Sequence, residues 1–483
     1  MNSLRLTVLA FALALAGCIA PPHEAVREHA IDADALGLGS SVAPRDTSPW
    51  WHAYGDAQLD RLMQKALGEN PTLAQALARV RSAQAGADAA HARTLPSLNL
   101  DAGATRQRFS RDDIVPPPLA GGVHSEGRAL LDFSWDLDFW GRQSSLLEQA
   151  RSQAIAAQLD ADGARLALTG AMLEAYIDLD RQYALADLAT RSAAQRQQIL
   201  DITRRRVGAG LDTNVELREA EGALPQSQVE LKQAQADRER AIHLLAALSA
   251  QGADAYAQVE RPHWQIDAAL LLPQTLPADL LARRPDVLAA RARVEAATSG
   301  QAAAKAAFYP DVNLTAFAGV AAIGLGNLFQ SASASYGVGP AIHLPIFDAG
   351  KLKAEFRGAT ADIDAAVGAY NAAVLRAVRE VSDQLSRIAT LAEQLDAQGK
   401  SLDAAEAAYR LAGERYKAGL SDYLVVLNAE TQVLATRRQR VDLIAAQATA
   451  RVALMLAVGG DFEPNRPQPA AVAAVISASG AAQ

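Results

Sequence analysis

Three kinds of side chain in this 483-residue sequence could carry covalent or acid–base chemistry: one cysteine, eight histidines and paired carboxylates. The histidines are scattered, and no two stand at the spacing of metal ligands. Asp136 and Asp138 alternate with apolar residues, which places them on the polar face of a predicted strand. Contact of that face with water accounts for the two carboxylates without acid–base chemistry. The glycines of "GVGP" (337–340) lack the rest of a nucleotide-binding pattern. The sequence therefore predicts no catalytic residue, no metal ligand and no cofactor. The role of the cysteine, Cys18, requires a different explanation.

Cys18 is the only cysteine, so it cannot form an internal disulfide. A short basic start, Met1 to Arg5, precedes the apolar run 6–16, which has the length of a signal-peptide core and is too short to span a bilayer. The tetrapeptide LAGC that ends at Cys18 resembles a bacterial lipobox, which implies cleavage before the cysteine and lipid, such as palmitate, on its sulfur. Ile19, where Asp would retain a lipoprotein in the inner membrane, favours the outer membrane. The alternative is an ordinary secretory signal with an incidental cysteine.

The bulk composition narrows the class of protein. The net charge is −8 and the sequence pI about 5.6, so nothing favours nucleic acid as a partner. No run of about 18 apolar residues follows the signal, and no transmembrane helix is predicted. Abundant alanine, with 21% charged residues, is typical of long helices with small side chains at their contacts.

The chain repeats itself. Residues 70–100 match 284–314 without a gap, and "RRVGAGL" (205–211) matches "ERYKAGL" (414–420) at an offset of 209. We therefore predict a tandem duplication of a unit of roughly 200 residues.

Each unit contains two segments of strand character. In "LDFSWDLDF" (131–139), apolar and polar residues alternate strictly, and four strands are predicted at about 95–109, 126–139, 309–320 and 335–347. Aromatic residues gather in the same regions. This pattern favours a lipid-facing barrel with a polar lumen, and the alternative is a soluble sheet with one dry face.

The remaining segments predict very long helices, at about 140–206, 211–250, 350–416 and 420–457. Ile363, Val367, Tyr370 and Val374 have the three- and four-residue spacing of a coiled-coil seam. A helix of about 65 residues is roughly 100 Å long and must pack beside others of similar length. Four strands cannot close a barrel, and open edges are not tolerated in lipid, so several copies must assemble. Three copies would supply twelve strands, although this geometry alone does not fix the number.

Several segments together resemble the outer-membrane efflux protein family (TolC-like), in the lipoprotein branch that serves resistance-nodulation-division pumps. They are "NPTLAQALARV" (70–80), "WDLDFWGR" (135–142), "ARRPDVLAARARV" (282–294), "FYPDVNL" (308–314), "LPIFDAGKL" (344–352) and "RYKAGLSDYLVVLNAE" (415–430). The resemblance implies an α+β membrane protein. Its homotrimer would form a twelve-stranded outer-membrane β-barrel, with four strands per chain, that continues into a periplasmic α-helical barrel. It also implies a periplasmic adaptor protein and an inner-membrane pump as partners, and outer-membrane lipid around the barrel.

The expected domain plan follows from the repeat and the resemblance. It comprises a signal peptide (1–17), a lipid anchor and linker (18–49), a first repeat (50–257), an equatorial linker (258–276), a second repeat (277–460) and a disordered Pro/Ala-rich tail (461–483).

The resemblance also implies a gate where the coils turn. In the family an apolar and an acidic residue close the tunnel tip, and here Leu424 fits the apolar position while Asn428 stands where the acid usually is. Asp422, Glu216 and Glu219 would add a diffuse negative field. The two hairpin tips are the expected adaptor contacts, through Gly208, Gly210, Leu211, Gly419 and Leu420.

Other functions were weighed against a passive channel. An enzyme lacks candidate residues, and a coiled-coil stalk or adaptor would not explain the alternating strands. A channel for type I protein secretion or for metal efflux remains the alternative, although four methionines and no histidine cluster give metal no support.

Overall fold

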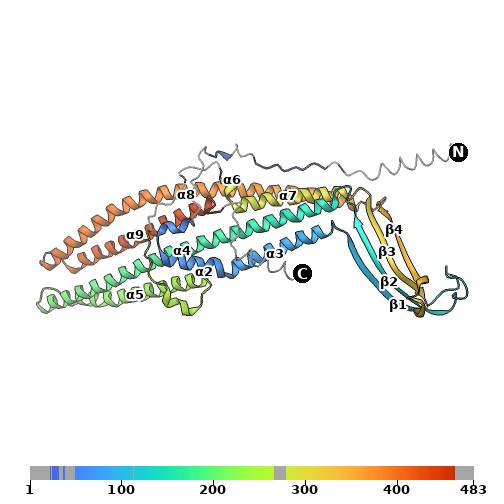
Figure 1. The fold of residues 1–483 in the computed structure, drawn as a ribbon. Helices are drawn as coiled ribbons and strands as arrows, with labels where there is room; N and C mark the ends of the chain where they lie inside the picture. Colours follow the sequence, from blue (N-terminus) through green and yellow to red (C-terminus); the bar gives the residue numbers. More distant parts are fainter. Residues whose placement is uncertain are drawn as a thin grey trace. The chain divides into compact units, whose positions relative to one another are not determined.

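The structure is a computed structural model that describes residues 22, 24–31, 36–38, 49–112, 114–265, 273 and 279–462. Cys18, the predicted signal peptide and the residues after 462 lie outside the described residues. The described chain is mostly helical and contains one four-stranded sheet (Figure 1). Its main elements are α2 (Ala57–Glu69), α3 (Pro71–Ala92), β1 (Ser97–Arg108), β2 (Val123–Asp136), α4 (Arg142–Gly208), α5 (Asn214–Leu248), α7 (Pro285–Ala306), β3 (Asp311–Ile323), β4 (Ala334–His343), α8 (Lys351–Lys417) and α9 (Tyr423–Ala457). Short helical turns include α6 (Leu280–Arg283) and η4 (Leu325–Asn327).

The chain forms two compact units, and each unit draws on both halves of the sequence. Of the described residues, unit 1 contains those in 22–30, 79–158 and 289–371, and unit 2 contains those in 31–78, 159–288 and 372–462. The two sequence repeats are therefore not two separate compact bodies. Among the described residues, no helix is both long and apolar enough to cross a membrane.

The sheet belongs to unit 1 and is antiparallel, in the order β1-β2-β3-β4. The β1–β2 register runs unbroken from Ser97↔Ser134 to Arg108↔Val123, so side chains alternate between the two faces without a bulge. Pairing of β2 with β3 joins the first repeat to the second. Neither β1 nor β4 has a strand on its outer side within the described chain.

Two strands end earlier than the sequence pattern predicts. The second was expected to reach 139 but ends at Asp136, because Asp138 takes a positive φ of 43° and its carboxylate accepts hydrogen bonds from the Gln143 and Ser144 amides, both at 2.8 Å. The fourth was expected to reach 347 but ends at His343, and Asp348 then accepts from the Leu352 amide at 2.7 Å. Alternation continues past both strands in the sequence, whereas helix capping by an acidic side chain stops the extended backbone.

The long helices are present. α4 and α8 have 67 residues each, which gives a length of about 100 Å, and α5 and α9 have 35 each. Pro71 and Pro285 begin α3 and α7, where a missing amide hydrogen has no cost. Small residues fill much of the buried side of α9, including Ala445, Ala448 and Ala450, as the alanine-rich composition predicts.

Candidate functional site

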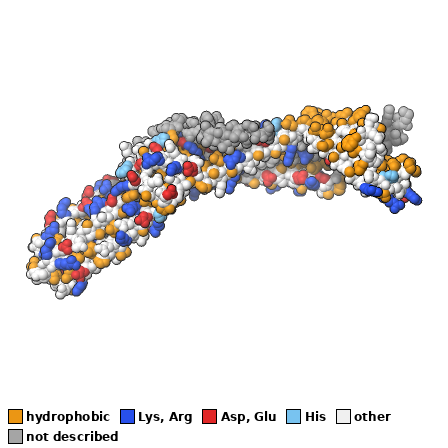
Figure 2. All heavy atoms as spheres, turned by 60° about the horizontal axis from the view of Figure 1, so that its bottom comes forward, with side chains coloured by type: hydrophobic (Ala, Val, Ile, Leu, Met, Phe, Trp, Pro, Cys, Tyr) orange, Lys and Arg blue, Asp and Glu red, His pale blue; other side chains and the backbone are white. Residues whose placement is uncertain are grey.

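The sheet has one apolar face. The register places these side chains together on it: Leu98, Leu100 and Ala102 of β1; Ala129, Leu131, Phe133 and Trp135 of β2; Leu314, Ala316, Ala318 and Val320 of β3; and Tyr336, Val338, Pro340 and Ile342 of β4. Several are strongly exposed in the single chain, and Tyr336 reaches 83%. Hydrophobic side chains gather over this end of the molecule in Figure 2. The opposite face carries Asn99, Asp101, Asp132, Ser134, Asn313 and Thr315. An apolar face of this size needs a nonpolar environment.

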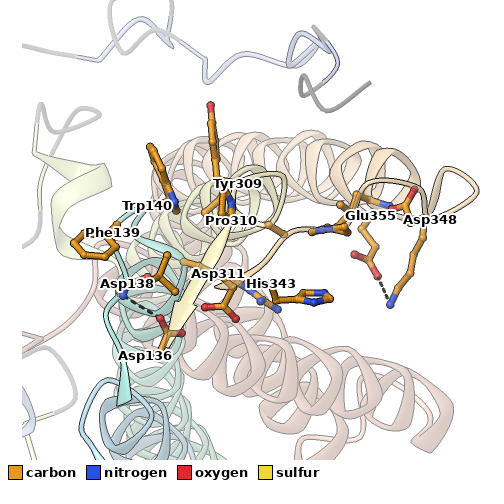
Figure 3. Close-up of a pocket in the computed structure, with 17 residues that line it drawn as sticks. Asp136, Asp138, Phe139, Trp140, Tyr309, Pro310, Asp311, His343, Asp348 and Glu355 are labelled. Atoms are coloured by element: carbon orange, nitrogen blue, oxygen red, sulfur yellow. Dashed lines mark hydrogen bonds and ion pairs between the residues drawn. The ribbon is translucent and has the colours of Figure 1, made fainter. Parts of the chain in front are cut away.

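Aromatic side chains mark the end of the sheet where the helices begin. Trp140 and Tyr309 stack with ring centroids 4.8 Å apart, and Phe139 and Phe347 are largely exposed beside the same turns. Figure 3 shows Trp140 and Tyr309 pointing the same way, above the acidic residues of the junction. Aromatic residues at one margin of an apolar band are typical of a membrane–water interface.

A cavity of about 340 Å³ lies at this junction, and several of its acidic residues have structural partners (Figure 3). Asp136 accepts from the Asp138 amide at 2.9 Å and from Gln143 Nε2 at 3.0 Å, while Glu355 lies 3.7 Å from Lys351 Nζ. No group of three metal-ligating side chains occurs within the described ranges. The junction therefore joins the strands to the long helices.

The two hairpin tips of unit 2 have the same turn. The Leu211 amide donates to the Arg206 carbonyl, and the Leu420 amide donates to the Arg415 carbonyl, both at 2.9 Å. Gly210 and Gly419 take positive φ values of 71° and 74°, which close the helix ends. Gly208 is the last residue of α4. Leu211 and Leu420 are exposed by 65% and 69%, so each tip presents one apolar side chain.

One core joins the two hairpins at their tips. It contains Ile199 and Leu200 of α4, Ala220 of α5, Ala412 and Tyr416 of α8, and Tyr423 and Val426 of α9. Figure 1 shows these four helix ends at the same end of the unit. The tips of one chain therefore form a single packed group.

A polar network, which we call the tip network, connects the hairpins through Thr203, Arg206, Asp212 and Tyr416. The Arg206 guanidinium donates to both Asp212 oxygens, at 2.8 and 3.0 Å, and to the Tyr416 carbonyl at 3.0 Å. The Tyr416 hydroxyl donates to Asp212 Oδ2 at 2.6 Å and lies 3.2 Å from Thr203 Oγ1. The Arg206 hydrogen bond and charge lower the pKa of Asp212, while burial and the Asp212 contact raise the pKa of Tyr416. Three residues of the first hairpin thus form hydrogen bonds with one residue of the second.

The structure brings only part of the predicted gate together. Leu424 and Asn428 lie one turn apart on the exposed side of α9, opposite the buried Tyr423 and Val426. Asp422 caps α9 by accepting from the Val425 amide at 3.2 Å.

On the first hairpin, Glu216 takes part in a capping box at the start of α5. It accepts from the Thr213 amide at 2.9 Å, and the Thr213 hydrogen bond lowers its pKa. Glu219 is exposed. Asp422 and Glu216 therefore have local structural roles at helix starts.

The sequence analysis missed the tip network and a buried carboxylate. Glu430 is 1% exposed, its nearest cationic atom is Arg196 Nε at 3.7 Å, and neither of its oxygens accepts a hydrogen bond among the described residues. Burial raises its pKa, against the effect of Arg196. The pair Arg206 and Asp212 could have been noticed from its six-residue spacing around a glycine turn. Tyr416 and the burial of Glu430 depend on tertiary packing.

A sheet with one apolar face, joined to 67-residue helices, defines the subunit of a membrane channel with a helical extension. A family model described as "Outer membrane efflux protein" matches residues 62–251 and 276–460, so the chain belongs to the outer membrane efflux protein family. The prediction of the family is confirmed, and so is the fold class of one four-stranded sheet and long helices per chain.

Individual relatives and solved structures support the same family assignment. The chain is 35% identical over 376 residues to "Fusaric acid resistance protein FusA" of Burkholderia cepacia, covering 75% of this chain and 70% of that protein. It is 31% identical to "Outer membrane protein OprJ" of Pseudomonas aeruginosa, covering 95% and 96% of the two chains. The crystal structure of the outer membrane protein VceC from Vibrio cholerae superposes with a TM-score of 0.81 at 34% identity, over 87% of this chain and all of that one.

Proposed function

We propose that this protein is the outer-membrane channel of a tripartite efflux pump, through which drugs or other small molecules pass passively to the outside. The observation that carries the proposal is the sheet, with one apolar face for lipid and one polar face for a water-filled bore. Membership of the efflux family supports it. The channel performs no catalysis, because the free energy for export comes from the pump.

The functional state is a homotrimer. The outer edges of β1 and β4 carry backbone groups that would be unsatisfied in lipid, so each edge must pair with another copy. Three chains give twelve strands, with β1 of one copy beside β4 of the next.

The two tips are the surface for the adaptor protein. Leu211 lines a hollow of about 450 Å³ together with Arg205, Arg206 and Lys417. An adaptor hairpin with small apolar residues and flanking acids fits this surface. Leu424 and Asn428 would face the axis of the trimer and narrow the bore.

The lipid anchor on Cys18 has geometric support in unit 1. Asp364 Oδ1 of α8 accepts from the Arg27 and Glu28 amides, at 2.8 and 3.0 Å, and Asn371 Nδ2 donates to the His29 carbonyl at 2.9 Å. Arg27 and Glu28 therefore lie about two helical turns nearer the start of α8 than His29 does, and that start is about 20 Å from Asp364. Nine extended residues reach at most about 30 Å, so Cys18 can reach the membrane level. Mass spectrometry of the mature protein tests this, and an unmodified cysteine would contradict it.

A lysine scan of β1 tests the placement of the sheet. Leu100→Lys points a charge into lipid, at a cost of about 2–4 kcal/mol near the bilayer midplane, and should prevent assembly. Asn99→Lys, one residue away on the opposite face, should assemble as a trimer by light scattering and conduct in planar bilayers. Equal tolerance of both variants would overturn the proposal.

The cargo is tested separately. A deletion strain should become sensitive to drugs and dyes and regain resistance with the wild-type gene. Channels for type I protein secretion or for metal are the alternative, and sensitivity to metal alone, or loss of a secreted protein, would favour them. Relatives include a "Toluene efflux pump outer membrane protein" and a "Pyoverdine export outer membrane protein", so the family carries small molecules of different kinds.

A further inference from the structure

The apolar face of β1 ends in two arginines. Leu98, Leu100, Ala102 and Ala104 share that face, and the unbroken register places Arg106 and Arg108 next on it. Both are exposed. The helices begin at the other end of the sheet, after Asp136 and His343. The arginines therefore lie at the margin farthest from the helices, which is the outer leaflet if the sheet has the membrane placement proposed above.

Among the described residues, no acid neutralises these side chains on their own face. Their partners across the register are Ser125 and Val123. Among the described residues, neither arginine forms an ion pair with a carboxylate. Glu126 is the nearest acid along β2, but it belongs to the opposite face and accepts from Gln107 Nε2 at 3.0 Å. Arg108 Nε donates only to the Gly121 carbonyl, at 3.3 Å.

Apolar side chains surround this basic margin. Val123 is 56% exposed, and the loop after β3 presents Leu325 and Phe329, exposed by 48% and 86%. Leu325 and Leu328 approach the sheet where Gly127 has no side chain, since a Cβ there would lie 2.8 Å from Leu325. In Figure 2, Lys and Arg side chains gather at the edge of the hydrophobic surface at the strand end. Cations beside exposed apolar groups fit an amphiphile better than a free ion.

We propose that Arg106 and Arg108 bind the phosphate groups of a phosphorylated glycolipid of the outer leaflet, whose acyl chains lie along Ala104, Ala102 and Leu100. Guanidinium groups bind phosphate through paired hydrogen bonds. The two Cα atoms are about 7 Å apart, so both side chains can reach one head group. The acyl chains would cover exposed side chains, among which Leu100 is 68% exposed in the single chain.

The test uses the full-length trimer in mixed micelles, with a bis-phosphorylated lipid A as the probe and its dephosphorylated form as the reference. Native mass spectrometry measures the bound lipid. The double variant Arg106→Gln/Arg108→Gln should bind the probe 10- to 100-fold more weakly, and the affinity of the wild type should fall with added salt. Arg128→Gln is the matched control, because Arg128 lies on the opposite face over Gly103 and should bind as the wild type does.

Three results would overturn the proposal: equal binding by the double variant, equal binding of the dephosphorylated lipid, or equal binding of phosphatidylglycerol, which would indicate any anionic lipid. Competition by millimolar inorganic phosphate would also contradict it, since it would indicate a free-phosphate site. Trimer formation and conductance are measured on the same samples. A conducting wild-type trimer without bound probe would refute the lipid site alone, whereas a failure to conduct would count against the channel function.

Discussion

The two hairpins of unit 2 derive from one repeated sequence, yet their tips are fastened differently. At the offset of 209, Arg206 corresponds to Arg415, and Asp212 corresponds to Ser421. Arg206 and Asp212 form a nearly buried ion pair, with 13% and 7% of their side chains exposed. Arg415 is exposed, and the serine at 421 offers it no charge. The turn is the same in both hairpins, but only the first hairpin has the ion pair.

The difference assigns separate tasks to the hairpins. The first hairpin contributes the ion pair of Arg206 and Asp212. The second contributes Tyr416, which forms hydrogen bonds with that pair, and the exposed residues Leu424 and Asn428. In a channel that closes at its tip, some helices must move during opening while others keep their position. We infer that the first hairpin is the fixed part and that releasing Tyr416 frees the second.

Removal of Asp212 should have the largest effect on the difference between the hairpins. Asp212→Ala leaves Arg206 without its partner, and breaking such a pair costs about 3–5 kcal/mol when it is buried. We expect a lower melting temperature and a larger open probability in planar bilayers. Ser421→Ala, the matched change in the second hairpin, should alter neither. If both variants behave alike, the two tips are equivalent.

The same network predicts a pH dependence. Because the pKa of Asp212 is lowered in the fold, its contribution is present above the ordinary aspartate pKa of about 3.9 and is lost as the pH falls through the lower folded value. The melting temperatures of wild type and Asp212→Ala should therefore converge only in strong acid.

Glu430 and its counterpart Glu221 provide the second test. Glu221 is a surface residue paired with Arg218 at 2.7 Å, whereas Glu430 is buried with its oxygens unpaired. Glu430→Gln should stabilise the protein at pH 8 by about 1 kcal/mol, the value of one pKa unit, because the amide removes a buried negative charge whose burial outweighs the attraction of Arg196. Glu221→Gln should change stability by less than about 1 kcal/mol.

The gain from Glu430→Gln should depend on pH. Burial raises the pKa of Glu430, so the folded state is favoured below the ordinary glutamate pKa and loses stability as the pH rises through the folded value. The advantage of glutamine should vanish near pH 4. A constant gain at every pH, in thermal unfolding, would show that the charge is not its cause.

The helix caps should give a smaller contrast. Thr213 has a capping box with Glu216, whereas Asp422 makes one bond to the Val425 amide at 3.2 Å. Thr213→Ala should cost about 1 kcal/mol, and Asp422→Ala somewhat less. Hydrogen exchange in the first turns of α5 and α9 measures the two costs, and a larger effect at Asp422 would contradict this ranking.

Asn428 should affect stability least, because it is exposed, and should affect conduction instead. Asn428→Asp would place one carboxylate per copy near the axis, and multivalent cations should then block the channel more strongly from the periplasmic side. Glu219→Gln, the counterpart in the first hairpin, should leave block unchanged. If Asn428→Asp also leaves it unchanged, the residue faces a helix contact.

Local patterns in the sequence predicted the fold well. Alternation in 131–139 placed Leu131, Phe133 and Trp135 on one face, and the register of three strand pairs confirms it. Proline positions fixed the starts of α3 and α7. These features depend on neighbours in the chain, so one sequence suffices to find them.

The tip network could not be found in this way. Asp212 and Tyr416 are 204 residues apart, and their contact depends on how two hairpins pack. The burial of Glu430 depends on the same packing, because its counterpart Glu221 has the same side chain but is 31% exposed and paired with Arg218. Whether Leu424 and Asn428 face the bore depends on other copies of the chain, which a single sequence does not describe.

The pairing of β2 with β3 has an evolutionary consequence, because it is where the two repeats meet within the sheet. An ancestor with a single repeat would have had two strands and one hairpin, and six copies of it could have built the same wall. All six hairpin tips of that ancestral assembly would have been identical, so an ion pair present in one tip would have been present in all. After gene duplication, the two hairpin tips of one chain can differ in sequence. The aspartate at 212 and the serine at the corresponding position 421 are such a difference.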